Sequence, residues 1–415
     1  DAVGDYVFGK PQGTSSVLGS IAGGVITMTS IIVTVLLVAL QQSSTNLTPQ
    51  VFDQFLRRRQ NQVFFGYFVG LAIFTLIVLA SIDSPFTPVF GALVTLAATL
   101  VALLMMITML YSTITQMRPV VIISAIHAHV LRARGAQRTL IARTRRRPRR
   151  ADLPVEITAD LGGFVTSIDV DALASIARDV GGEVELTVSI GGFVATGDVI
   201  ALWRGGLDGE RIERATRRAV HIERRRDITR DPAYGIEQLQ TIGWSAISSA
   251  KHNQEAGLLC IRLLRDVLGC WAASGDLDVI EQDARHAEVA VVYRDNVAAN
   301  LLEAFELLGM VTAESFQQQC LAAVLDSFSA VYGRLSARSR ERADQLLLHL
   351  LAPLAEQTLT STLDNAASRL EDALRAAQAN AVLVPLERTH EALCTRATRL
   401  REVGPSSRMA HRRDE

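Results

Sequence analysis

The chain has 415 residues, of which 49% are hydrophobic, and its mean hydropathy is +0.22. This hydrophobic content exceeds that of most soluble enzymes of similar length and predicts membrane-spanning segments within a chain of two or three domains. The net charge is only −1, but the first third is basic and the acidic residues lie almost wholly after Asp152. Binding partners must therefore be considered separately for each part of the chain.

A first membrane helix is predicted over residues 17–40, because no charge occurs between Lys10 and Asp53 and a span needs about 20 apolar residues. Its small and polar residues recur every three or four positions, which places them on one helix face. Such a face is typical of a helix-packing seam, or of a surface that lines a water-filled path in an oligomer. We call this face the polar stripe; its members are Ser20, Gly23, Thr27, Ser30, Thr34 and Gln41.

Two further membrane helices are predicted over residues 63–82 and 89–111, after an extracytoplasmic lead-in of residues 1–16. The second helix contains Gly66 and Gly70 in a G-x-x-x-G pattern that permits close helix contact. Three basic residues that precede it are expected at lipid headgroups. These are Arg57, Arg58 and Arg59.

Residues 118–151 form a predicted basic stalk that contains ten arginines and no acid before Asp152. By the positive-inside rule, everything after Tyr111 is expected in the cytoplasm of a bacterial cell, with the membrane helices in the inner membrane. This orientation places the start of the chain outside and favours a fourth span upstream. The arginines have no interleaved aromatic residues and follow a span directly, so we expect no nucleic-acid partner.

Residues 152–206 alternate between apolar and polar positions around pairs of glycines, which predicts a small β domain with a short helix near residues 171–180. The run Gly192 to Ile200 resembles the turn of biotinyl- and lipoyl-type barrel-sandwich domains. Those domains carry their cofactor on a lysine, and this chain has none between Lys10 and Lys251. The interpretation is therefore a barrel-sandwich-like domain without a covalent cofactor.

The remainder is predicted to be a mainly helical cytoplasmic domain over residues 207–403, followed by a solvated tail of residues 404–415. Its four cysteines form no C-x-x-C pair and are expected to be free buried thiols of a reducing compartment. They are Cys260, Cys270, Cys320 and Cys394.

Two long segments, residues 38–70 and 231–248, together with the barrel-like segment, resemble the family of predicted bacterial membrane proteins named domain of unknown function 2254. The resemblance covers nearly the whole chain. It implies a multi-pass membrane protein with a further hydrophobic segment upstream, and it supplies no activity.

The sequence contains no phosphate-binding loop, no nucleophile elbow and no H-E-x-x-H zinc motif. We therefore expect no catalytic residues, no cofactor and no metal site. Two hypotheses of function remain. The first is a homo-oligomeric pore, transport-like or sensor protein; the second is a membrane-anchored scaffold that binds a protein partner through its cytoplasmic helices. Membrane lipids are expected partners in both.

Overall fold

The computed structural model describes residues 11–46, 59–82, 88–116, 118–206, 209–248, 253–275 and 290–410. The chain divides into two compact units, Asp1–Ile122 and Ile123–Glu415. We call the first the membrane unit and the second the body, and each is described by itself.

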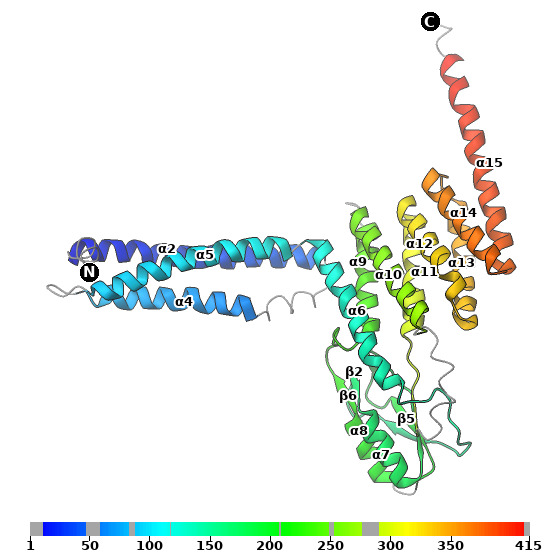
Figure 1. Cartoon of the computed structure of the whole chain (residues 1–415), viewed down its shortest axis with the longest axis horizontal. Coiled ribbons are helices and arrows are strands. Elements are labelled where there is room, and N and C mark those ends of the chain that lie inside the picture. The colour runs from blue at the N-terminus through cyan, green and yellow to red at the C-terminus, as the bar shows by residue number, and fades with distance from the viewer. Residues whose placement is uncertain are drawn as a thin grey trace. The chain divides into compact units, whose positions relative to one another are not determined.

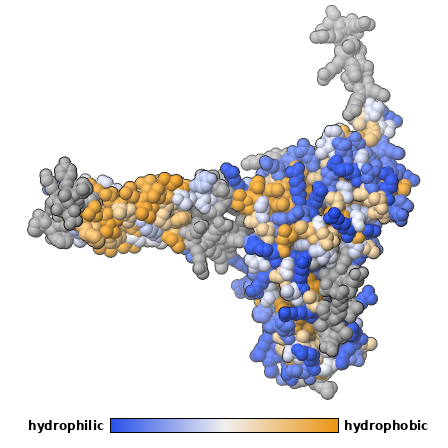
Figure 2. Space-filling model, in the orientation of Figure 1, coloured by the Kyte–Doolittle hydropathy of each residue, from blue (hydrophilic) through white to orange (hydrophobic). Residues whose placement is uncertain are grey.

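The membrane unit contains three long helices, α2 (Pro11–Asn46), α4 (Arg59–Ala80) and α5 (Val89–Gln116), which lie side by side (Figure 1). Each holds a stretch long and apolar enough to span a membrane: Gln12–Thr34, Gln62–Ala80 and Val89–Ser112. Their visible surface is almost entirely hydrophobic (Figure 2). The prediction of three membrane helices is confirmed, although α2 begins at Pro11 rather than near residue 17. Proline suits the first turn of a helix, where its missing N–H costs nothing.

A small apolar core joins the three membrane helices. Val25 and Ile32 of α2 pack with Phe68 of α4 and with Ala102 and Met109 of α5. In the apolar 18-residue window of each span, only 22%, 22% and 17% of the residues are buried within the chain. Most of the surface of each span is therefore available to lipid or to other helices.

Most of helix α6 (Pro119–Ile141) belongs to the body, which continues into two β-sheets. The strands of the first sheet are ordered β1-β5-β3-β7, and those of the second β4-β2-β6. The elements of this region are β1 (Val155–Thr158), β2 (Gly163–Ile168), α7 (Val170–Val180), β3 (Glu183–Leu186), β4 (Phe193–Val194), β5 (Val199–Arg204), α8 (Gly209–Ala219), β6 (Val220–Glu223) and β7 (Val291–Val292).

The predicted barrel-sandwich is not supported, because the described strands form two open sheets and no closed one. β4 pairs only with β2, whereas β5, which follows it directly, pairs with β1 and β3 of the other sheet. The second edge of β3 is occupied by the distant strand β7, in parallel. Alternation of apolar residues indicates a strand with one buried face, but it does not identify the strand's neighbours. The short predicted helix near residues 171–180 is confirmed as α7, capped by the side chain of Asp169.

One hydrophobic core serves both sheets and the helices that cover them. It includes Val165 of β2, Leu173 of α7, Trp203 of β5 and Ile212 of α8. The indole N–H of Trp203 is also buried, and it donates a 2.9 Å hydrogen bond to Thr216 Oγ1 on α8. Such a partner removes the desolvation cost of burying the indole.

The rest of the described body is helical, as predicted. Gly243 permits close packing of three of these helices, since a Cβ there would lie 3.1 Å from Leu308 and 3.2 Å from Cys260. The helices are α9 (Pro232–Ser248), α10 (Gln254–Ser274), α11 (Val297–Glu314), α12 (Gln318–Val331), the short 3-10 helix η2 (Tyr332–Arg334), α13 (Ala337–Ala355), α14 (Ser361–Ala376) and α15 (Asn380–Ala410).

Candidate functional site

The polar stripe lies on the side of α2 that the chain's own helices leave uncovered. Leu18, Val25 and Ile32, which recur every seven residues, are fully or almost fully buried and form the opposite side of the helix. The described stripe residues are all exposed; they are Ser20, Gly23, Thr27, Ser30 and Thr34. Gln41 belongs to α2, but its side chain lies outside the described residues. Among the described residues, the stripe is therefore not a seam between α2 and the other membrane helices.

Three stripe hydroxyls donate to backbone carbonyls one turn earlier in α2. Ser20 donates to Ser16 at 2.9 Å, Thr27 to Gly23 at 2.8 Å and Thr34 to Ser30 at 2.9 Å. These bonds satisfy the hydroxyl protons and leave oxygen lone pairs directed away from the helix. The stripe is consequently tolerated in a membrane and can still accept hydrogen bonds from water or from a second helix.

Among the described glycines of the membrane helices, Gly91 of α5 packs closely against Val78 of α4, but several others make no close contact within the chain. A Cβ added at Gly19, Gly23, Gly66 or Gly70 would meet no atom within 4 Å. The G-x-x-x-G pattern of α4 therefore faces open space, as does the glycine in the stripe of α2. Small residues of this kind permit close approach of a second helix.

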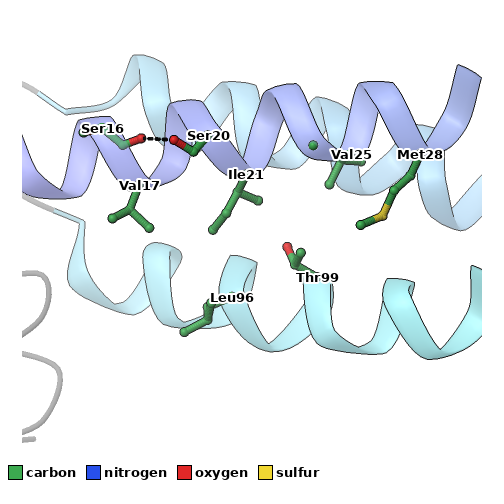
Figure 3. Close-up of a pocket in the computed structure, with 9 residues that line it drawn as sticks. Ser16, Val17, Ser20, Ile21, Val25, Met28, Leu96 and Thr99 are labelled. Carbon is green, nitrogen blue, oxygen red and sulfur yellow. Dashed lines mark hydrogen bonds between the residues drawn. The ribbon is translucent and has the colours of Figure 1, made fainter.

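An open groove of about 380 Å³ lies between α2 and α5 (Figure 3). Ile21 of α2 and Thr99 of α5 point into it from opposite sides. Its walls are mostly apolar, and Ser20 is the one stripe residue among them. The groove suits an acyl chain or an apolar side chain better than water.

Of the three arginines predicted at lipid headgroups, Arg57 and Arg58 lie outside the described residues. Arg59 is the first residue of α4, and its side chain is also outside the described part of the chain.

In the body, Arg226 joins the β-sheets to helix α9. Its Nε donates to Asp231 Oδ2 at 2.8 Å, and its Nη1 pairs with Glu237. The guanidinium carbon lies 4.5 Å from the ring centroid of Tyr234, at a distance typical of a cation–π contact. We call Arg226, Asp231, Tyr234 and Glu237 the Arg226 cluster.

Asp231 has both carboxylate oxygens occupied. Oδ1 accepts from the backbone N–H of Tyr234 at 3.0 Å and caps α9, while Oδ2 accepts from Arg226. Burial raises the pKa of the Asp231 carboxyl, and the bond from Arg226 opposes that rise. Burial also raises the pKa of Tyr234 to about 12. A phenol with this pKa stays protonated at neutral pH, so Tyr234 is not available as a base.

The turn Ser189–Gly192 lies directly against Asp231. A cavity of about 190 Å³ beside it is lined by this turn, by Arg226, by Asp295 just before α11 and by the first turn of α11, including Asn300. The backbone N–H of Ile190 donates to the hydroxyl of Tyr293 at 3.2 Å. The cavity is polar, but the charge of Arg226 is already paired with two carboxylates. These ion pairs position the turn, the sheets and the helices of the body relative to one another.

A second buried ion pair joins α6 to the segment before α11. Arg134 Nη1 lies 3.3 Å from Asp295 Oδ2, and the two side chains are 2% and 6% exposed. The guanidinium lies 5.3 Å from the ring centroid of Trp271 on α10. The sequence assigned Arg134 to a basic stalk; the structure places it inside the body.

The cysteines differ in exposure more than the sequence predicts. Cys260 and Cys320 are buried as expected, whereas Cys270 is exposed and Cys394 is half-buried. Burial raises the pKa of Cys260 to about 12 and that of Cys320 to about 11. Thiols with such pKa values are poor nucleophiles.

Sequence reasoning missed the link of Asp231 to Arg226 and to the Gly191 turn. These side chains form no local pattern in the sequence, because three strands and a helix separate the turn from Asp231. It also missed a group on α14 and α15, formed by Asp364, His390 and Cys394. The spacing of four between His390 and Cys394 was the available signal, since residues four apart share a helix face.

A family model described as a predicted membrane protein, domain of unknown function 2254, matches residues 1–315. No curated protein and no solved structure matches the chain. The matched range includes the three membrane helices, the two sheets and the body helices through α11, while α12 to α15 follow it.

Proposed function

Since this chain belongs to the family of predicted membrane proteins named domain of unknown function 2254, we propose that it is a homo-oligomeric pore or transport-like protein. In this proposal the α2 helices of several copies bring their polar stripes together around a path across a bacterial inner membrane. The body then acts on the cytoplasmic side as a vestibule or sensor.

The observation that carries the proposal is the position of the stripe. Its five described residues are exposed on the side of α2 opposite the buried Leu18, Val25 and Ile32. A lipid-facing helix gains nothing from five small or polar residues in a row along one side. Contact with a second copy of the same helix uses both features, because Gly23 permits close approach and the hydroxyl oxygens accept hydrogen bonds.

A path lined by α2 would be only moderately polar. The hydroxyl protons of Ser20, Thr27 and Thr34 are bonded to their own backbone, so water would meet oxygen lone pairs and no charged group from these positions. Pores of this character are sensitive to apolar constrictions, because a narrow apolar ring expels water.

We expect Thr27→Phe to abolish ion flux in liposomes while the oligomer remains assembled. Thr27 lies in the middle of the stripe and is exposed in the single chain, so a phenyl ring there would project into the proposed path. Val33→Phe is the matched control, because Val33 is exposed on α2 but lies outside the stripe. Flux under voltage or membrane tension and oligomer mass in detergent are the measurements.

Absence of flux in the wild-type protein would contradict the pore. If Thr27→Phe instead disperses the oligomer, the stripe is a packing seam, since overfilling a close contact costs about 1–3 kcal/mol. A wild-type protein that is monomeric and carries no flux would favour the scaffold.

The proposed orientation has its own test. Cys270 is exposed and Cys394 is half-buried, whereas Cys260 and Cys320 are buried. In a Cys394→Ser background, we expect an impermeant maleimide to label Cys270 in inside-out membrane vesicles and not in intact cells. Removal of the label by Cys270→Ser identifies the site. Labelling of intact cells would reverse the proposed topology.

A further inference from the structure

Helices α14 and α15 bring four metal-binding types of side chain onto facing surfaces. Asp364 and Glu371 are seven residues apart on α14, and His390 and Cys394 are four apart on α15. Both spacings keep side chains on one face of a helix. The two helices pack against each other after a short connection, so the two faces meet.

His390 is the centre of this group. Its Nε2 lies 2.8 Å from Asp364 Oδ1, and its Nδ1 lies 2.7 Å from Glu371 Oε1. One oxygen of Asp364, one ring nitrogen of His390 and the sulfur of Cys394 all lie within 4.8 Å of one another. The His390 side chain is only 11% exposed, and that of Glu371 15%.

We infer that Asp364, His390 and Cys394 bind a divalent transition-metal ion, with Zn²⁺ as the best fit to the donor set. Thiolate, imidazole and carboxylate are the ligand types that Zn²⁺ takes in proteins, at bond lengths of about 2.0–2.3 Å in a tetrahedron. Ligand atoms in such a tetrahedron lie roughly 3.5 Å apart. Asp364 must move slightly away from Nε2 and Cys394 slightly inward, within the reach of side-chain rotation. Binding displaces a proton from the thiol, and from Nε2 where that atom carries one, to water.

Glu371 completes the arrangement as a positioning residue. A carboxylate on the far nitrogen of a ligating histidine fixes the ring and its tautomer, so that the other nitrogen faces the metal. Glu371 occupies this position on Nδ1, which leaves Nε2 for the ion. Beside the ring lies an open cavity of about 480 Å³, which has room for a water molecule as the fourth ligand. Its lining residues are Glu371, Glu387, His390, Glu391, Cys394 and Thr395.

A purely structural role would need only His390 and its two carboxylates, as a hydrogen-bonded link between two helices. The body has such a link elsewhere: His349 on α13 bonds Glu306 on α11 at 2.8 Å. Among the described residues, His349 and Glu306 belong to no group of side chains that could hold a metal ion. The α14–α15 group differs in adding a thiol, that of Cys394, close to Asp364 and to the imidazole of His390. That difference predicts a metal–thiolate bond, which can be measured.

The test uses the full-length protein in detergent, purified without a histidine tag and stripped with a chelator. We expect Co²⁺ to bind at one ion per chain, with the visible bands of tetrahedral cobalt and a near-ultraviolet sulfur-to-cobalt charge-transfer band. Zn²⁺ should displace Co²⁺ and abolish both sets of bands. Absence of the charge-transfer band in the wild-type protein would overturn the site, whatever the variants do.

Variants assign the ligands. We expect Cys394→Ser to remove the charge-transfer band, His390→Gln to lower Zn²⁺ affinity at least tenfold, and Glu371→Gln to lower it about 10–100-fold without removing the band. Cys270→Ser and His349→Gln are the matched controls and should bind cobalt as the wild type does. A charge-transfer band that survives Cys394→Ser but disappears with Cys270→Ser would also contradict the assignment.

Discussion

Replacing Glu183 with alanine should lower the free energy of unfolding of the body by about 3–5 kcal/mol. The carboxylate is 3% exposed and lies 3.0 Å from Nη2 of Arg145, which is itself 7% exposed. Its two oxygens also accept the backbone N–H groups of Arg149 and Arg150, at 3.0 Å each for the shorter bonds. The substitution removes the carboxylate that neutralises a buried guanidinium and that accepts hydrogen bonds from two backbone N–H groups. Both losses lower the free energy of unfolding.

Tryptophan fluorescence during urea unfolding in detergent is a suitable measurement, because all three tryptophans, Trp203, Trp244 and Trp271, lie in the body. Asp171→Ala is the control. Asp171 pairs with Arg143 at 2.7 Å, but the two side chains are 73% and 59% exposed, and exposed pairs contribute about 0–1 kcal/mol. Equal losses for the two variants would show that burial does not increase the contribution of the Glu183 pair to the free energy of unfolding.

The same ion pairs show where prediction from the sequence stops. The ten arginines of residues 118–150 were visible as a basic segment next to a membrane helix. The positive-inside rule depends on their number and not on their partners. Arg134 pairs with Asp295 and Arg145 with Glu183, and neither partner is near in sequence. Folding decides these pairs through the packing of α6 and β3, so no local pattern indicates them.

The membrane helices were predictable because both of their signals are local. A long run without charge gives the span, and spacings of three and four give the face. Only the structure shows which side of α2 is covered by its own chain. In the sequence, the buried residues Leu18, Val25 and Ile32 cannot be distinguished from the other apolar residues of the span. The stripe could thus be predicted as a face, but its exposure could not.

The β region shows the opposite case. Glycine pairs at residues 181–182 and 191–192 correctly indicated turns, and Gly181 and Gly191 do have positive φ angles of 64° and 86°. The sheet partners could not be predicted, because strand β7 comes from a segment about 100 residues after β3 and its two residues carry almost no signal of their own. The reason for a glycine at position 191 also lies outside the turn, in a helix cap forty residues later.

Gly191→Ala should therefore destabilise the body much more than a turn glycine usually does. At φ 86° a side chain is strained, which costs about 1–3 kcal/mol. The new Cβ would also lie 2.1 Å from Asp231 Oδ2 and 2.6 Å from its carboxyl carbon. Asp231 must then move away from Arg226 and from the N–H of Tyr234, and loss of such a cap costs about 0.5–2 kcal/mol. We expect a total loss of about 1.5–5 kcal/mol from these two terms.

Gly197→Ala separates the effect of backbone strain from the effect of the collision with Asp231. Gly197 has a similar φ of 93°, but a Cβ there would meet no atom within 4 Å, so only the backbone strain applies. The difference between the two variants in the free energy of unfolding measures the collision with Asp231. Because Asp231 starts α9 and holds Arg226, that collision should also raise hydrogen exchange in the first turn of α9 for Gly191→Ala alone. Equal destabilisation of the two variants, with no change in exchange at α9, would show that the turn and the cap are independent.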